Sequence, residues 1–125
     1  MLAVLLLTAC ASFRAPEVPM RTIDITPRHP GHCLVVLLPG RYAKPEVFRS
    51  SRFAEAVSSR GLPIDLVAAD AHLGYYRERS VVERLRIDVI EPARKLGYRE
   101  IWIAGTSLGG LGGRHVHAHG GCQCR

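Results

Sequence analysis

Ile101-Trp102-Ile103-Ala104-Gly105-Thr106-Ser107-Leu108-Gly109 is the stretch of the sequence on which the fold prediction depends. Its first four residues form an apolar run of the length expected for a buried strand. The two glycines flank Ser107 in a Gly-x-Ser-x-Gly spacing, which suits a sharp turn from a strand into a helix. That spacing is common by chance, and the strand in front of it is what makes it informative. We therefore expect Ser107 on a tight turn above the edge of a sheet.

Strands and helices alternate in the residues before this turn. Apolar or alternating runs predict strands at 22–26, 33–38 and 64–69. Helices are expected at 45–60 and 80–96, because Gly61 and Gly97 follow them as stop signals. This alternation is typical of parallel sheets with right-handed crossovers. The sequence predicts a doubly wound, mostly parallel α/β sheet that stops after the strand leading to Ser107.

The two helices carry more detailed expectations. Ser80 and Glu83 have the spacing of a capping box, and Pro92 should kink the second helix because it lacks an amide donor. The residues expected to be buried in the first helix are Val47, Phe48, Phe53 and Val57. The apolar face of the second comprises Val82, Leu85, Val89, Ala93 and Leu96.

The turn around Ser107 has the features of a site for acyl chemistry. Gly105 and Gly109 let neighbouring backbone pass close to the serine. The amide of Leu108 begins the following helix and is aimed where a tetrahedral oxyanion would form. A phosphate-binding loop is the alternative, but neither G-x-G-x-x-G nor the P-loop lysine spacing is present. Ser107 is therefore the candidate nucleophile.

A second oxyanion donor is expected from the loop that follows the strand at 33–38. Gly40 would let this loop turn inward. The amide of Arg41, or less favourably that of Tyr42, would then complete the oxyanion hole.

These motifs together resemble bacterial α/β-hydrolases of the esterase/lipase-like type. The resemblance covers roughly residues 21–112 and is carried by residues 37–41, 91–94, 97–98 and 101–110. Such enzymes hydrolyse esters or related acyl bonds through an acyl-enzyme on the serine. The resemblance implies a partial α/β-hydrolase fold, Ser107 as the catalytic residue, a small ester-type substrate and no cofactor.

The rest of a catalytic triad is not found after Ser107. In this family an Asp or Glu and then a His follow the nucleophile along the chain, whereas no acidic residue follows it here. The histidines at 115, 117 and 119 come too early to lie on a returning catalytic loop. A serine without a base is a weak nucleophile. We expect a catalytically incomplete fragment whose resemblance ends near Gly112 because the reading frame shifts or the gene is interrupted.

Asp70 and His72 follow the strand at 64–69, on the side of the sheet where loops form active sites. Tyr75 or Tyr76 could contact a substrate there. Use of Asp70 and His72 as a substitute dyad would need a topology that the family does not show. Asp70 is therefore interpreted as ordering its own loop.

The first ten residues predict a signal that directs the protein to a bacterial cell envelope. Residues 1–9 are apolar and far short of the ~20 residues that span a bilayer. Leu7-Thr8-Ala9-Cys10 matches a bacterial lipobox, which predicts lipidation of Cys10 and attachment to a membrane. Ala11 favours the outer membrane, with the protein facing the periplasm. Residues 11–21 would be a tether. The alternatives are an apolar first strand and, without a functional signal, a cytoplasmic protein.

The domain proper is expected at 22–113, and residues 114–125 differ from it abruptly in composition. Glycines and the lack of an apolar face predict no helix there. The candidate metal ligands of this tail are His115, His117, His119, Cys122 and Cys124. Their H-x-H-x-H and C-x-C spacings do not match structural zinc sites. The alternatives to a hydrolase are a non-catalytic envelope lipoprotein that binds a ligand or partner, and a protein that binds metal through this tail.

The net charge of +6 comes mainly from scattered arginines. No zinc-finger spacing, no basic helix leading into heptads and little aromatic content accompany it. The charge is interpreted as a solvated surface, and no nucleic-acid partner is expected. The sequence does not indicate an oligomeric state.

Overall fold

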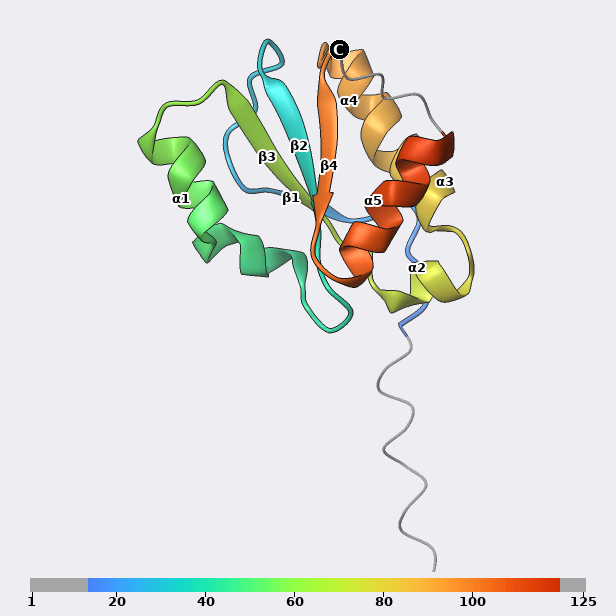
Figure 1. Cartoon of the computed structure of the whole chain (residues 1–125). Helices are drawn as coiled ribbons and strands as arrows, with labels where there is room; N and C mark the ends of the chain where they lie inside the picture. The colour runs from blue at the N-terminus through green and yellow to red at the C-terminus, as the bar shows by residue number, and fades with distance from the viewer. Residues whose placement is uncertain (1–13, 120–125) are drawn as a thin grey trace, which may run out of the picture.

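One four-stranded sheet organises the described part of the chain, which in this computed structural model comprises residues 14–119. The strands are β1 (Thr22–Asp24), β2 (Cys33–Leu38), β3 (Ile64–Ala69) and β4 (Ile101–Gly105). They lie in the order β1-β3-β2-β4 (Figure 1). β3, β2 and β4 are parallel, whereas β1 is antiparallel to β3. The predicted α/β class is confirmed, with a mixed sheet whose first strand is reversed.

The reversal of β1 follows from the length of the connection after it. Residues 25–32 are too few for the helical crossover that joins parallel strands. β1 therefore pairs with β3 instead of lying beside β2, with Ile23 opposite Ala68. β2 and β3 are almost wholly buried, which agrees with their continuous apolar runs.

Helices cover both faces of the sheet (Figure 1). A 3₁₀ segment, η2 (Pro45–Ser50), and α1 (Arg52–Ser59) lie on one side. The elements of the other side are α2 (Leu73–Arg77), α3 (Val81–Leu85), the π-helical η3 (Arg86–Ile90), α4 (Glu91–Leu96) and α5 (Leu108–His119). Two hydrophobic cores result, one for each face. The core beneath α1 includes Val35, Leu37, Val57 and Leu66. The core on the other face includes Leu34, Val36, Tyr75, Leu85 and Val89.

The predicted helix at 45–60 is interrupted at Ser51. The backbone of Ser51 is extended (ψ 148°), and its hydroxyl oxygen accepts a hydrogen bond from the Ala54 amide at 3.2 Å, so that it caps α1. The 3₁₀ turn before it has three residues per turn, which changes the helical register. Val57 is buried and Phe48 partly so, but Val47 and Phe53 are 54% and 44% exposed. Their predicted burial was wrong.

The second predicted helix is continuous from α3 to α4 but contains one π turn. Leu85, Val89 and Ala93 are buried as expected, whereas Leu96 is 56% exposed. The wider π turn changes the helical register of the residues after it, so that Ala93 stays on the face set by Leu85 while Leu96 turns away from it. It lies directly before Pro92, which has no amide to continue an α-helical ladder. Gly97 ends the helix with φ +110°, as predicted.

Ser80 does not form the predicted capping box. Helix α3 begins after it at Val81, but the Ser80 side chain makes no capping hydrogen bond. Arg79 has φ +56°, and the turn brings Ser80 back over the end of α2. There its amide donates to the Tyr75 carbonyl at 2.9 Å and its hydroxyl to the same oxygen at 3.5 Å. The hydroxyl therefore serves the preceding helix.

Residues 14–21 pack against the domain, contrary to the expectation of a tether. Met20 is buried, and its amide donates to the Asp88 carboxylate at 2.8 Å. The Tyr75 hydroxyl donates to the Glu17 carbonyl at 2.8 Å and accepts from the Glu17 amide at 3.0 Å. A buried tyrosine hydroxyl needs such a partner, so this segment is part of the fold. The lipobox and Cys10 lie outside the described residues.

Helix α5 extends to His119, so the prediction that no helix forms beyond residue 113 was wrong for 114–119. The helix packs on β4 and α3 through its first residues. Once a first turn is formed, each further residue adds a hydrogen bond at little cost. Residues 120–125 and the side chains of 114–119 lie outside the described set.

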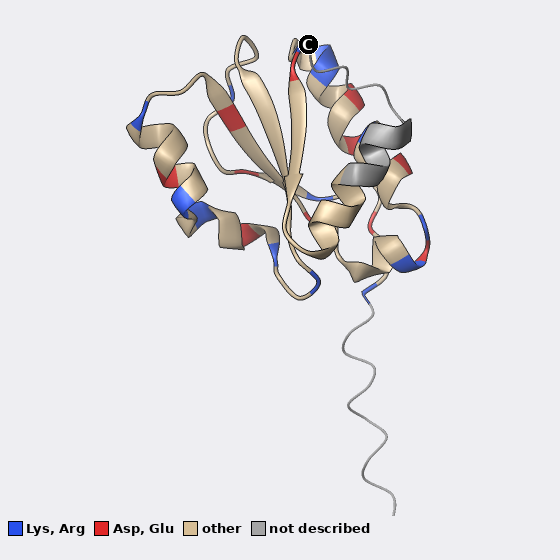
Figure 2. Ribbon diagram, viewed as in Figure 1, with Lys and Arg blue, Asp and Glu red and all other residues tan. Residues whose placement is uncertain are grey.

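Acidic and basic residues are interspersed along the same helices and loops (Figure 2). Five of the described arginines form salt bridges within the chain: Arg14, Arg21, Arg28, Arg84 and Arg86. Within residues 14–119, no helix combines the length and the apolar character needed to cross a membrane.

Because of the π turn, two leucines of one helix differ in burial, and truncating them should differ in its effect on stability. Leu85→Ala should lower the free energy of unfolding by about 2–5 kcal/mol, because the side chain is fully buried. Leu96→Ala should change it by less than about 0.5 kcal/mol, because Leu96 lies in solvent. Urea unfolding of the two variants measures both values. Equal losses would show that both leucines share one buried face.

Candidate functional site

The chain reverses from β4 into α5 within two residues, Thr106 and Ser107. Ser107 has φ +53°, in the left-handed region that residues with a Cβ rarely adopt. This conformation costs about 1–2 kcal/mol, and it persists only where the surroundings impose it. The serine is exposed to solvent.

The two glycines of the motif are sterically required. A Cβ on Gly105 would lie 2.2 Å from the carbonyl carbon of Gly109, and a Cβ on Gly109 would lie 2.3 Å from the Leu38 carbonyl oxygen. No other residue fits at either position without movement of backbone. This is the close approach that the Gly-x-Ser-x-Gly spacing predicts.

The loop after β2 lies directly beside this turn because β2 pairs with β4. The Thr106 amide donates to the Leu38 carbonyl at 3.3 Å. A Cβ built on Gly40 would lie 3.8 Å from the Cβ of Ser107. The structure therefore brings together the two segments that were predicted to form an oxyanion hole.

Three backbone amides at this edge are available to a ligand. Leu108 is the first residue of α5, and its amide has no acceptor within the helix. Arg41 and Tyr42 occupy the centre of a turn closed by a hydrogen bond from the Ala43 amide to the Gly40 carbonyl at 3.1 Å. Neither of them donates any of the loop or turn backbone hydrogen bonds found within residues 14–119. Tyr42 is 80% exposed, with the Arg41 guanidinium 5.1 Å from its ring centre.

The hydroxyl of Ser107 has no catalytic base among the side chains of residues 14–113. None of the hydrogen bonds found there involves it. No protein-family model, curated protein or solved structure matches this chain. The functional proposal therefore depends on the geometry of the turn itself.

Asp70 and His72 lie at the same edge of the sheet but serve the fold. The buried Asp70 carboxylate accepts hydrogen bonds from Arg14 and, at 3.3 Å, from Arg21. The His72 amide donates to the Asp70 carbonyl at 2.9 Å. Asp70 thus orders its loop and the N-terminal segment, and it does not contact Ser107.

His72 is a partly buried histidine at the start of α2. Its Nδ1 accepts a hydrogen bond from the Gly74 amide at 3.2 Å and caps α2. Its Nε2 is buried without a partner among the described residues, as is the hydroxyl of Tyr76. Burial lowers the pKa of His72, and the nearby charge of Arg14 lowers it further.

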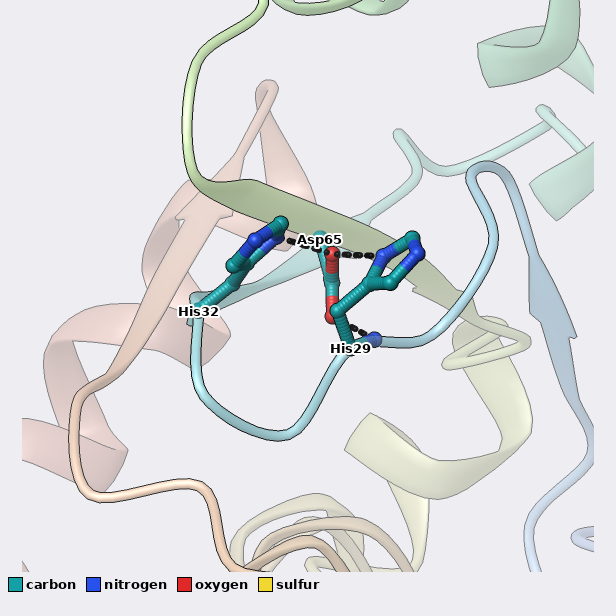
Figure 3. A group of neighbouring side chains, drawn as sticks. All are labelled: His29, His32 and Asp65. Atoms are coloured by element: carbon teal, nitrogen blue, oxygen red, sulfur yellow. Dashed lines mark hydrogen bonds and ion pairs between the residues drawn. The ribbon is translucent and has the colours of Figure 1, made fainter.

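A second polar cluster, which the sequence analysis missed, lies at the opposite edge of the sheet. It comprises Asp65 in β3, with His29 and His32 before β2 (Figure 3), and Tyr98 after α4. Asp65 Oδ1 lies 3.3 Å from Nδ1 of His29 and 3.0 Å from Nδ1 of His32. Its Oδ2 accepts a hydrogen bond from the Tyr98 hydroxyl at 2.6 Å and another from the His29 amide.

Asp65 is ionised in this setting. Burial opposes its ionisation, but the hydrogen bonds from Tyr98, His29 and His32 outweigh it and lower the pKa of the carboxyl. Burial and the hydrogen bond to Asp65 raise the pKa of Tyr98 to about 12. One sequence signal could have revealed the cluster, since an aspartate inside the apolar run of β3 must find partners when it is buried.

The candidate metal ligands of the tail are divided between α5 and the residues after it. His115, His117 and His119 lie on α5, but their side chains are outside the described set. Cys122 and Cys124 lie beyond the described residues.

Gly109→Ala tests the close approach at the turn. In an ordinary helix this substitution stabilises by up to about 1 kcal/mol, but here the new Cβ meets the Leu38 carbonyl. We expect a loss of at least about 1–3 kcal/mol. Gly31→Ala is the matched control, because no atom lies within 4 Å of its Cβ position. Stabilisation by Gly109→Ala in urea unfolding would exclude the contact.

The lowered pKa of His72 predicts a pH dependence of stability. The unfolded chain, with a histidine pKa of about 6.5, takes up the proton at a higher pH than the folded protein does. The contribution of His72 is therefore fully present above pH ~6.5 and is lost as pH falls through the folded pKa.

His72→Asn should remove this part of the pH dependence while retaining a side-chain acceptor for the Gly74 amide. Urea unfolding of both proteins at a series of pH values between 5 and 8 measures the difference. Parallel curves of stability against pH for the wild type and the variant would show that His72 does not cause this pH dependence.

Proposed function

We propose that Ser107 is the nucleophile of a serine-hydrolase site for esters or related acyl bonds. The observation that carries the proposal is the left-handed serine at the carboxyl end of β4, held between two glycines that admit no side chain. A serine in a strained, exposed position lowers the stability of the fold. We therefore attribute the presence of Ser107 to the chemistry of its hydroxyl.

The surrounding amides supply the second part of the chemistry. When the Ser107 oxygen bonds to an acyl carbon, the carbonyl oxygen becomes an oxyanion. The Leu108 amide at the start of α5 and the Arg41 amide in the neighbouring loop are the proposed donors, with Tyr42 as the alternative to Arg41. The bond to the alcohol oxygen then breaks, the proton lost by Ser107 reaches that oxygen through solvent, and the alcohol leaves an acyl-enzyme. Such donors accelerate the reaction even when the triad is incomplete.

The side chains of residues 14–113 provide no base to take the proton of Ser107. The proposed site is therefore reactive towards strong electrophiles but slow towards esters, because an unassisted serine hydroxyl is a weak nucleophile. The proposed substrate is an acyl compound small enough to reach this exposed edge of the sheet.

The lipobox at residues 7–10 supports a second part of the proposal. Lipidation of Cys10 would attach the protein to a membrane of a bacterial envelope, with the outer membrane favoured by Ala11. The described N-terminal segment runs to the edge of the domain that carries Asp70, the same edge that carries Ser107. A lipid anchor would thus place the proposed site on the side of the domain near the membrane.

A fluorophosphonate probe tests the nucleophile. The Ser107 oxygen should bond to phosphorus as fluoride leaves, which gives a covalent adduct that mass spectrometry assigns to this residue. Ser107→Ala should abolish labelling. The rate should be at least about a thousand-fold below that of a hydrolase with a complete triad, because no described base assists.

Ser59→Ala is the matched control, because Ser59 is also exposed but lies at the end of α1 with an ordinary helical backbone. It should label as the wild type does. Folded protein, verified by circular dichroism, that remains unlabelled would refute the nucleophile and favour a non-catalytic lipoprotein that binds a ligand or partner.

A further inference from the structure

The cluster of His29, His32 and Asp65 brings three metal-ligating side chains to one point (Figure 3). The two imidazoles come from the loop before β2, and the carboxylate comes from the first half of β3. One ligand atom of each residue lies within 4.8 Å of the others. The ring centres of the histidines are 4.9 Å apart.

We propose that His29, His32 and Asp65 form a binding site for a divalent transition metal ion of the zinc class. Two imidazole nitrogens and one carboxylate oxygen are a donor set that Zn²⁺ prefers. With bonds of about 2.0–2.1 Å, the ligand atoms of a tetrahedral Zn²⁺ lie roughly 3.3 Å apart. The two nitrogen–oxygen distances of the cluster, 3.3 and 3.0 Å, are close to this value.

The carboxylate is already oriented for an ion. Asp65 Oδ2 is held by the Tyr98 hydroxyl and the His29 amide, so the other oxygen faces the two imidazoles. Outer-sphere hydrogen bonds of this kind orient metal ligands and tune their affinity. The loop itself is closed by the His32 amide, which donates to the His29 carbonyl at 2.7 Å.

For the ion to bind, each imidazole changes tautomer: the proton that Nδ1 now donates to Asp65 is exchanged for one on Nε2, which frees the Nδ1 lone pair. A neutral imidazole carries its single proton on Nε2 when Nδ1 is a ligand. The ion would take the position of the hydrogen bonds that Nδ1 of each ring now makes with Asp65.

Access and a fourth ligand position are available on the solvent side. The side chains of His29 and His32 are 58% and 36% exposed, whereas that of Asp65 is 3% exposed. A pocket of about 680 Å³ opens beside His32. Its other lining residues include Pro63, Arg99 and Glu100. Water from this pocket can complete a four-coordinate ion.

This site is separate from the proposed nucleophile. Asp65 is near the amino end of β3, whereas Ser107 follows the carboxyl end of β4, and the parallel strands place these ends at opposite edges of the sheet. The ion would join the loop at 29–32 to the central sheet. The inference does not depend on the hydrolase proposal.

Zinc titration of the full chain tests the site, provided that the C-terminal tail is silenced. The background protein carries His115→Asn, His117→Asn, His119→Asn, Cys122→Ser and Cys124→Ser. It should bind one Zn²⁺ by isothermal titration calorimetry. His29→Asn and His32→Asn in this background should each weaken binding by about 100-fold or more, and Tyr98→Phe by about 10–100-fold.

Three readouts make the result unambiguous. His72→Asn, the same substitution at a histidine of the opposite edge, should leave zinc affinity unchanged. Co²⁺ in place of Zn²⁺ should give the intense visible absorption of a four-coordinate ion, and His32→Asn should abolish it. Circular dichroism establishes that each variant is folded. Absence of binding in the tail-silenced protein, or binding that His29→Asn and His32→Asn leave intact, would show that the cluster is only a hydrogen-bonded contact.

Discussion

Where β2 and β4 end side by side, three backbone segments approach so closely that no side chain fits between them. Gly105, Gly109 and the carbonyl of Leu38 meet there, and this contact fixes the direction in which α5 leaves the sheet. The chain reverses there within two residues, Thr106 and Ser107, and one of them has a left-handed conformation. Ser107 occupies that position, and the loop at Gly40 is brought to it because β2 is the neighbour of β4.

Two buried carboxylates of the described chain, those of Asp65 and Asp70, lie towards opposite ends of β3. Asp65 near its amino end is satisfied by two imidazoles and a tyrosine hydroxyl, whereas Asp70 just beyond its carboxyl end is satisfied by two arginines. A buried charge without partners is too costly to retain, so each carboxylate recruits a segment distant in sequence. Asp70 holds the N-terminal residues and Asp65 holds the loop before β2. The ordering of both segments follows from this requirement.

Local sequence patterns predicted many of the strands and helix ends. They could not predict contacts between residues that are distant in the sequence. The strands at 33–38 and 64–69 and the stops at Gly61 and Gly97 follow from apolar runs and from the conformational freedom of glycine. The exposure of Leu96 depends on one π turn in the helix before Pro92, which the apolar pattern did not reveal.

The difference between local and long-range contacts also explains why only one of the two candidate sites was recognised from the sequence. Gly-x-Ser-x-Gly can be recognised because its residues are adjacent along the chain, and its steric logic concerns the chain's own backbone. The cluster at Asp65 joins residues more than thirty positions apart, and only the pairing of β2 with β3 brings them together.

The polarity of a parallel sheet gives the two sites different tasks. The carboxyl ends of the strands carry the exposed turns, where the backbone is strained and amides lack acceptors, so that edge is suited to binding and reaction. The amino ends carry a carboxylate with hydrogen bonds to both of its oxygens, and that edge is suited to holding the fold together. Strain at Ser107 lowers the stability of the domain, and a cross-link between the loop at 29–32 and β3 raises it. An ion at the second edge would thus offset part of the energetic cost of the turn at the first, with no contact between the two sites.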